Sequence, residues 1–182
     1  MIAPTELQTD RLTLRMLRES DLDDYAEMCA DPEVMRYLGD GKPMDRGMAW
    51  RNLALMVGHW SLRGYGQWAA VERSSGTLVG RIGFWRPEGW PDFEIGWTLR
   101  RSFWGRGYAT EAARAALQLA FTEMQRSHVI SLIRPDNAAS IRVAERLGER
   151  LVETIELLGT PALMYRLNRD EWKQEPRASA RG

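Results

Sequence analysis

The turn at residues 104–109 is the feature that most restricts how this chain can fold, because it joins a strand-like stretch to a long alanine-rich helix. Its sequence is Trp104-Gly105-Arg106-Gly107-Tyr108-Ala109. The residues before it, 93–99, have the spacing of a strand, and residues 108–124 have that of a helix. Glycine removes side-chain bulk, and the first N–H groups of a helix have no partner within the helix. The turn is therefore predicted to be able to hold a phosphate-like anion.

The remaining elements follow from the spacing of apolar residues. Strands are predicted at residues 7–17, 68–72, 78–85, 93–99, 129–133, 151–157 and 162–167. Helices are predicted after an N-cap at Ser20, from Pro32 to Leu38, and at residues 44–62, 108–124 and 137–147. Residues 39–43 and 86–91 are predicted loops. Helices on a mixed, mostly antiparallel sheet of about seven strands define an α+β architecture.

The bulk composition indicates one domain, which we expect at residues 1–170, followed by a polar tail at 171–182. Lys plus Arg and Asp plus Glu number 25 each. This balance gives no reason to expect nucleic acid or a membrane as a partner. The single Cys29 and the absence of a signal-like N-terminus suit the cytoplasm. No apolar stretch approaches the ~20 residues of a spanning helix.

Other readings of the glycine turn remain open. A nucleotide P-loop requires G-x-x-x-x-G-K-[ST], and Gly41-Lys42 is followed by Pro43. A dinucleotide fingerprint would need a third glycine where Thr110 stands. A third reading is a tight turn that only packs the helix against the strand.

Several motifs, in this order, resemble the GNAT superfamily of N-acetyltransferases, and within it the branch that acetylates ribosomal-protein N-termini. The opening strand corresponds to Thr9-Asp10-Arg11-Leu12-Thr13-Leu14-Arg15, and a short helix start to Asp31-Pro32-Glu33-Val34. The fourth strand corresponds to Glu94-Ile95-Gly96-Trp97, and the pyrophosphate turn to residues 103–112. The pantetheine-side helix corresponds to Asn137-Ala138-Ala139-Ser140, ending at Leu147-Gly148. The resemblance covers residues 7–167.

The resemblance implies that acetyl-CoA lies between two splayed strands, at residues 93–99 and 129–133. The implied pantetheine contacts are backbone groups of Ile95, Trp97 and Leu99, together with Asn137, which is also a good N-cap. The implied pyrophosphate contacts are at Gly105, Arg106, Gly107, Tyr108, Ala109 and Thr110. No metal is expected.

This sequence departs from the family pattern at three positions. Trp104 stands where the pyrophosphate motif often begins with Gln or Arg. Ala144 occupies the position of a general-acid tyrosine, and Glu149 stands where an aromatic residue often follows the glycine. A mechanism that relies on that tyrosine is therefore in doubt.

The implied reaction is direct attack of a primary amine on the thioester in a ternary complex. Amines are mostly protonated at pH 7, so the site must remove a proton. Glu94 is the candidate base, since strand alternation places it on one face with Gly96 and Thr98. Ser140 is the candidate acid for the leaving thiolate. His59 and His128 lie in no catalytic motif, and Cys29 is expected to serve packing.

The acceptor is expected opposite the cofactor, near Tyr37, Trp60, Trp85 and Trp90. A protein N-terminus and a small-molecule amine are both compatible with the sequence, as are a monomer and a homodimer. The alternative function is a non-catalytic acyl-CoA-binding regulatory module of the same fold.

Overall fold

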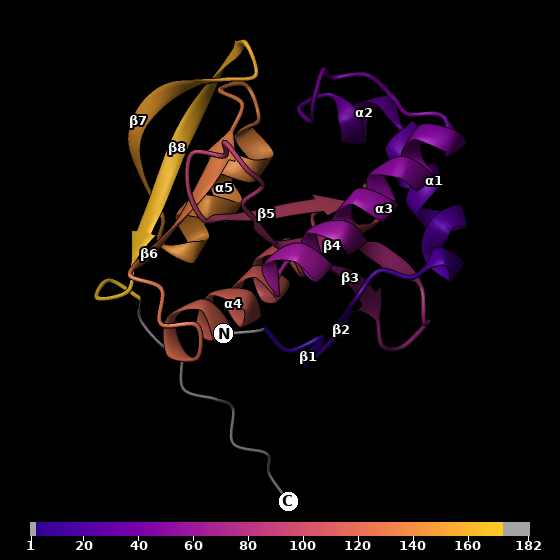
Figure 1. The fold of residues 1–182 in the computed structure, drawn as a ribbon, viewed down its shortest axis with the longest axis horizontal. Helices are drawn as coiled ribbons and strands as arrows, with labels where there is room; N and C mark the ends of the chain where they lie inside the picture. The colour runs from indigo at the N-terminus through magenta and orange to yellow at the C-terminus, as the bar shows by residue number, and fades with distance from the viewer. Residues whose placement is uncertain (1–2, 173–182) are drawn as a thin grey trace, which may run out of the picture.

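The fold is built on one eight-stranded sheet, shown in the computed structural model of Figure 1, which describes residues 3–172. The strand order is β1-β2-β3-β4-β5-β6-β8-β7, and only β5 and β6 are parallel neighbours. The strands are β1 (Glu6–Gln8), β2 (Leu12–Arg15), β3 (Gln67–Glu72), β4 (Leu78–Trp85), β5 (Glu94–Leu99), β6 (His128–Ile133), β7 (Arg150–Leu157) and β8 (Thr160–Asn168). This confirms the predicted α+β mixed sheet.

The extra strand arises at the N-terminus, where one strand was predicted over residues 7–17. A turn at Thr9 divides this segment into the hairpin β1–β2. The Thr9 N–H donates to the Leu12 carbonyl oxygen, and the Leu12 N–H donates to Thr9 Oγ1. A threonine hydroxyl that bonds its own backbone locally competes with the strand ladder, and this explains the break.

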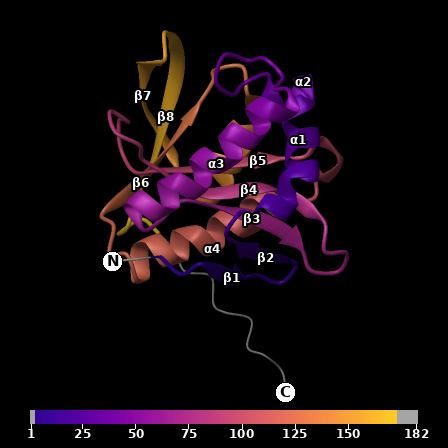
Figure 2. The same ribbon diagram turned by 45° about the vertical axis from the view of Figure 1, so that its right-hand side comes forward.

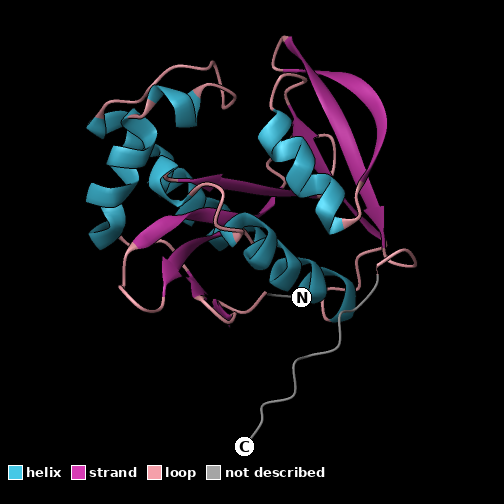
Figure 3. Cartoon of the chain, turned by 180° about the vertical axis from the view of Figure 1, so that it is seen from behind, coloured by secondary structure: helices cyan, strands magenta, loops and turns pink. Residues whose placement is uncertain are grey.

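Helices cover both faces of the sheet and enclose two main apolar clusters. They are α1 (Leu22–Ala30), α2 (Pro32–Met35), α3 (Arg46–Arg63), α4 (Tyr108–Thr122) and α5 (Ala138–Leu147). The alanine-rich face of α4 packs on Leu12, Trp68, Ile82 and Ile95, whereas α1, α2 and α3 share a second cluster with Ala69 and Leu78. Figure 2 shows α3 lying across the strands, and Figure 3, from behind, brings α4 and α5 forward.

The start of α1 differs from the prediction that Ser20 caps it. A short 3-10 turn at Glu19–Asp21 comes first, and Ser20 caps nothing. Asp21 is buried and accepts two hydrogen bonds from the Arg15 guanidinium, at 2.7 and 2.8 Å. A buried charge needs a partner, so the Arg15–Asp21 pair decides where the helix begins.

The ends of the other helices follow local capping chemistry. Asp31 accepts from the Glu33 N–H and caps α2, which ends at Met35 rather than at the predicted Leu38. Asp45 caps α3, and Asn137 caps α5 as predicted. At the C-terminus, Trp172 packs against Phe121, so the predicted tail is partly docked; its residues 173–182 lie outside the described part of the chain.

One carboxylate ties the N-terminal hairpin to the start of α4. Glu111, in the first turn of α4, accepts hydrogen bonds from the Thr9 hydroxyl at 2.6 Å and from the Arg11 N–H at 2.9 Å. The Arg11 guanidinium also pairs with it at 2.6 Å and donates to the Arg106 carbonyl oxygen at 2.9 Å. Burial raises the pKa of Glu111, but the Thr9 and Arg11 hydrogen bonds outweigh burial, and the net pKa is lowered.

We therefore predict that Glu111→Gln destabilises the fold by about 1–2 kcal/mol at pH 7, because a charge-assisted set of hydrogen bonds is weakened. A lowered pKa stabilises the fold above the unfolded-state value of 4.5 and loses this effect as pH falls through the folded-state value. Wild type and variant should therefore converge in acid. Urea titrations at pH 7 and pH 3 measure this, with the exposed Glu123→Gln as control; a gap that stays constant with pH contradicts it.

Candidate active site

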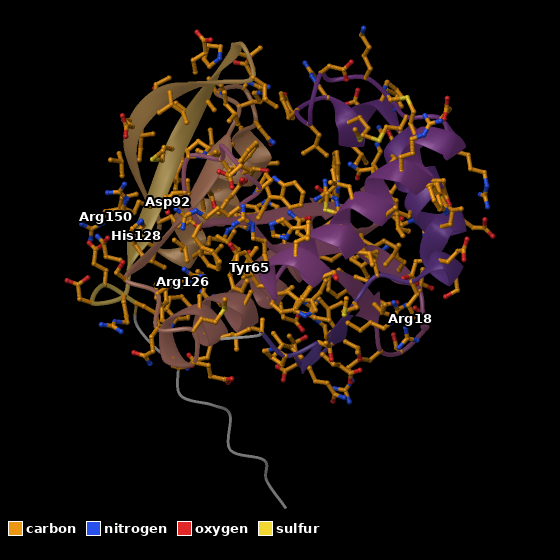
Figure 4. The ribbon with its side chains drawn as sticks, in the orientation of Figure 1. Arg18, Tyr65, Asp92, Arg126, His128 and Arg150 are labelled. Carbon is orange, nitrogen blue, oxygen red and sulfur yellow. The ribbon has the colours of Figure 1, made fainter. Side chains whose placement is uncertain are left out.

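The parallel strands β5 and β6 are joined at one end and separate at the other. The joined end has one registered pair, Glu94 with Ile130, and the Ile130 N–H donates to the Phe93 carbonyl oxygen at 3.1 Å. Nearby, His128 Nε2 and Asp92 Oδ2 lie 2.7 Å apart. Figure 4 labels these two residues close to each other. Figure 1 shows β5 crossing between the group of β6–β8 and α5 and the group of α1–α3. The separation leaves backbone groups of β5 without a neighbouring strand.

Glu94 stands at the point where the strands part. Its Oε2 accepts from Trp90 Nε1 at 2.6 Å. A Cβ built on Gly96 would lie 3.6 Å from Glu94 Oε1, so these two residues share a face, as alternation predicts. Burial raises the pKa of Glu94 to about 7, against the lowering by hydrogen bonds from Trp90 and the Leu132 backbone and by the charge of Arg81. A carboxyl with that pKa exchanges protons readily near neutral pH.

Two polar residues that the sequence interpretation missed extend this face of the sheet. Gln67 on β3 is buried, and its amide oxygen accepts from the Arg81 guanidinium on β4. The Gln67 Nε2 would lie 3.4 Å from a Cβ on Gly96. The sequence does contain an indication of them, because a polar glutamine and a charged arginine lie within the otherwise mostly apolar strands Gln67–Glu72 and Leu78–Trp85. Gln67, Arg81 and Glu94 therefore form a group of polar side chains on one face of the sheet, beside the point where β5 and β6 separate.

Of the four aromatic residues expected around the acceptor, two lie beside Glu94. Trp90 donates to the Glu94 carboxylate, and Trp85 pairs with Glu94 in the β4–β5 register. Tyr37 is partly buried, and the Arg36 guanidinium lies over its ring.

The structure places Trp60 in the core rather than on an open surface. Its side chain is 4% exposed and packs in the core against Trp68, at 5.3 Å between ring centroids. Its indole N–H donates to the Gln67 carbonyl oxygen at 3.0 Å, so the polar end is already satisfied. A helical spacing of apolar residues does not by itself distinguish a core tryptophan from a pocket tryptophan.

The two histidines have structural partners. His59 stacks on Trp85 at 4.5 Å, and its Nε2 accepts from the Arg86 N–H at 3.2 Å. Burial lowers the pKa of His59, so the ring is neutral at pH 7. It thereby anchors the start of the 86–91 loop, and His128 anchors its far end through Asp92.

The turn before α4 presents a row of backbone donors. Gly105 and Gly107 have φ of +74° and +82°, in the left-handed region that glycine adopts without strain. Among residues 3–172, no group accepts a hydrogen bond from the backbone N–H groups of residues 105–109. Nothing lies within 4 Å of a Cβ built on Gly105. The turn is thus open and electropositive, which suits a phosphate.

Two side chains of the turn itself, Arg106 and Trp104, pack against neighbouring residues. The Arg106 guanidinium lies 5.2 Å from the Phe103 ring centroid. Trp104, in the family's Gln or Arg position, is 45% exposed and donates its indole N–H to the Leu99 carbonyl oxygen at 2.9 Å. Trp104 therefore fastens the turn to the end of β5.

The backbone groups expected for pantetheine are not equally free. The Ile95 carbonyl accepts from the Ser131 hydroxyl at 2.9 Å, and that of Leu99 accepts from Trp104. A carbonyl oxygen has two lone pairs, so a second donor is still possible at each. Within residues 3–172, no side chain donates a hydrogen bond to the carbonyl oxygen of Trp97.

The start of α5 lies beside Trp97 of β5. The Asn137 side-chain oxygen accepts from the Ser140 N–H at 3.1 Å, which leaves its amide N–H groups for another acceptor. The Ser140 hydroxyl accepts from Trp97 Nε1 at 3.3 Å and keeps its own proton for donation. Ala144 is fully buried against Ile133 and Tyr165.

Residues 3–172 contain no cluster of three or more His, Cys, Asp or Glu that could hold a metal ion. Within the same residues no helix is long and apolar enough to cross a membrane.

Comparisons with known proteins agree with this geometry. The model of the acetyltransferase (GNAT) domain matches residues 11–150. YkkB of Bacillus subtilis, an uncharacterized protein, is 36% identical over 91% of this chain and 96% of its own. The FsC-acetyl coenzyme A-N(2)-transacetylase of Aspergillus fumigatus is 29% identical over 93% of this chain and 79% of its own.

A solved structure is also similar. The acetyltransferase from Agrobacterium tumefaciens has a TM-score of 0.81 and 32% identity, covering 92% of this chain and 96% of its own. The family match spans both the glycine turn and the strands that part at Glu94. The chain therefore belongs to the GNAT family of acetyltransferases.

Proposed function

We propose that this protein is an N-acetyltransferase that moves an acetyl group from acetyl-CoA to a primary amine by direct attack. The observation that carries the proposal is that one strand, β5, begins at a carboxyl with a pKa of about 7 and leads at its other end to an open row of backbone donors. The N-transacetylase relative, whose name includes acetyl coenzyme A, supports the choice of acyl donor.

The open turn fits the pyrophosphate of that donor. The N–H groups of residues 105–109 would hold it, with Arg106 and Thr110 at the same helix start, and Asn137 and the backbone of Trp97 would bind the pantetheine arm. The donor supplies a thioester whose carbonyl carbon the amine attacks. The role of the turn is to place this thioester at the gap between β5 and β6.

Glu94 would accept the proton of the incoming ammonium, directly or through water. Trp90 holds one carboxylate oxygen, and this orients the other toward the face shared with Gly96. The acceptor would enter on that face, between Trp85, Trp90 and the Gln67–Arg81 pair. Ser140, whose hydroxyl proton is not used by Trp97, would protonate the leaving thiolate.

The first test of this function is Glu94→Gln, which keeps the size of the side chain and its bond to Trp90. A general base contributes roughly 10²–10⁴-fold to rate, so kcat should fall by that factor while the Kd for acetyl-CoA stays nearly unchanged. In wild type, kcat/KM should rise as pH increases through about 7, because only the ionised carboxyl accepts a proton.

The matched control is Glu88→Gln, a fully exposed carboxylate in the same loop as Trp90. Steady-state kinetics from pH 6 to 9 and calorimetric titration of acetyl-CoA provide the two readouts. If Glu94→Gln keeps full kcat across this range with an amine that is acetylated, Glu94 is not the base.

The second test concerns the phosphate cradle and uses Gly105→Ala. The Cβ would enter the open space in front of the turn and should weaken acetyl-CoA binding roughly tenfold, the effect of losing about one good hydrogen bond. Gly76→Ala is the matched control, since Gly76 has a similar φ of +72° and equally open surroundings in the β3–β4 turn. Equal affinity in the two folded variants would reject the cradle.

A further inference from the structure

A side-chain bridge crosses the gap between β5 and β6 just beyond their last backbone pair. Ser131 of β6 donates its hydroxyl to the Ile95 carbonyl oxygen at 2.9 Å. Ile95 directly follows Glu94, whose pairing with Ile130 ends the ladder. The bridge therefore fixes the width of the gap one residue from the proposed base.

Glu149 stands behind this bridge. It follows Gly148 at the end of α5, and its N–H donates to the Ala144 carbonyl oxygen at 3.0 Å. The residue is only 3% exposed, and its Oε1 lies 3.1 Å from the Ser131 Oγ. Its Oε2 is buried and has no hydrogen-bond partner among residues 3–172. No cation pairs with it in that part of the chain.

The number of protons decides which form of Glu149 lets both contacts of Ser131 be full hydrogen bonds at once. A serine hydroxyl has one proton to donate. If that proton bonds the Ile95 carbonyl, the contact between Ser131 Oγ and Glu149 Oε1 is a hydrogen bond only when Glu149 is the donor. The chain then runs from the Glu149 acid to Ser131 and from Ser131 to Ile95. Ionised Glu149 would instead draw the serine proton to itself and leave the Ile95 carbonyl without a donor.

The charges around Glu149 favour the neutral acid. Burial raises the pKa of Glu149 to about 8, and the charge of Glu94 adds to this, although the Ser131 bond lowers it. From β8, Tyr165 faces the same region, and the charges of Glu145 and Glu149 raise its pKa after burial. Arg81 acts on Glu94 from β4. The groups that face Glu149 are therefore acids or a phenol, which disfavour a second negative charge.

We propose that Glu149 is a positioning residue of this site: as a neutral acid it orients the Ser131 hydroxyl onto the Ile95 carbonyl and so holds β5 beside β6 next to Glu94. The proposal rests on the proposed function only in that Glu94 is taken as the base. Ionisation of Glu149 releases the Ile95 carbonyl, so the site loses its alignment at alkaline pH.

The test compares wild type with Glu149→Gln, Ser131→Ala and the control Glu145→Gln, an exposed glutamate of α5. The glutamine amide donates to Ser131 at every pH and cannot ionise. Wild-type kcat/KM should decline several-fold above pH 8, whereas Glu149→Gln should show no decline up to pH 9.5. Ser131→Ala should be reduced about tenfold at all pH values because the bridge is absent. Glu145→Gln should follow wild type.

Thermal unfolding of the same proteins tests the protonation without any acceptor. A raised folded-state pKa gives stability that is complete below the unfolded-state value of 4.5 and lost as pH rises through about 8. The Tm of Glu149→Gln should therefore exceed that of wild type by an amount that grows from pH 5 to pH 8 and then levels off.

Two results would overturn the proposal. A Tm difference that is equal at every pH means that Glu149 is not held neutral, whatever the turnover shows. An unchanged alkaline decline in Glu149→Gln means that Glu149 does not align the site. Failure of Glu94→Gln to lower turnover contradicts the choice of base instead, and the unfolding comparison does not depend on it.

Discussion

The separation of β5 from β6 after one registered pair is the constraint on which the rest of this site depends. Parallel strands that continued side by side would satisfy each other's backbone groups and leave no room for a ligand. Here the joined end is fixed by the hydrogen bond from the Ile130 N–H to the Phe93 carbonyl oxygen and by the hydrogen bond between His128 and Asp92. Beyond it, side chains reach across the gap in place of the ladder: Ser131 bonds Ile95, and Glu94 accepts from the Leu132 backbone.

Two buried carboxyls, those of Glu94 and Glu149, lie beside the separation of β5 from β6, and neither ionises easily. Glu94 and Glu149 have raised pKa values of about 7 and about 8, and burial is the first cause for both. The partners differ. Hydrogen bonds from the Trp90 indole and the Leu132 backbone, together with the charge of Arg81, lower the pKa of Glu94. Within residues 3–172, the hydrogen-bond partner of the Glu149 carboxyl is Ser131. With these surroundings, Glu94 can exchange protons near pH 7, whereas Glu149 keeps its proton, so we infer different roles for the two carboxyls.

Features set by neighbouring residues could be predicted from the sequence, but those set by distant contacts could not. The glycine turn and the alanine-rich helix after it follow from local chemistry, as does the face shared by Glu94 and Gly96. Ser20 does not cap α1 because Asp21, the next residue, is buried and pairs with Arg15 of β2, and the sequence does not show which of two neighbouring polar residues is buried. Trp60 was placed at the acceptor site because spacing does not show what a buried ring packs against. The hydrogen bonds from Glu149 through Ser131 to Ile95 join the connection after α5 to β6 and β5, and no local sequence pattern predicts them.

The proposed reaction is attack by an amine on a thioester placed at this gap. The most direct measurement supplies acetyl-CoA carrying ¹³C in the acetyl carbonyl together with a panel of small amines and peptides with free N-termini. An N-acetyltransferase should give an amide carbonyl signal on at least one acceptor, with one equivalent of free thiol released for each amide formed. Tight binding of acetyl-CoA with no thiol released, or thiol released only with labelled acetate, would contradict it. The first of these outcomes would identify a module that binds the cofactor without using it.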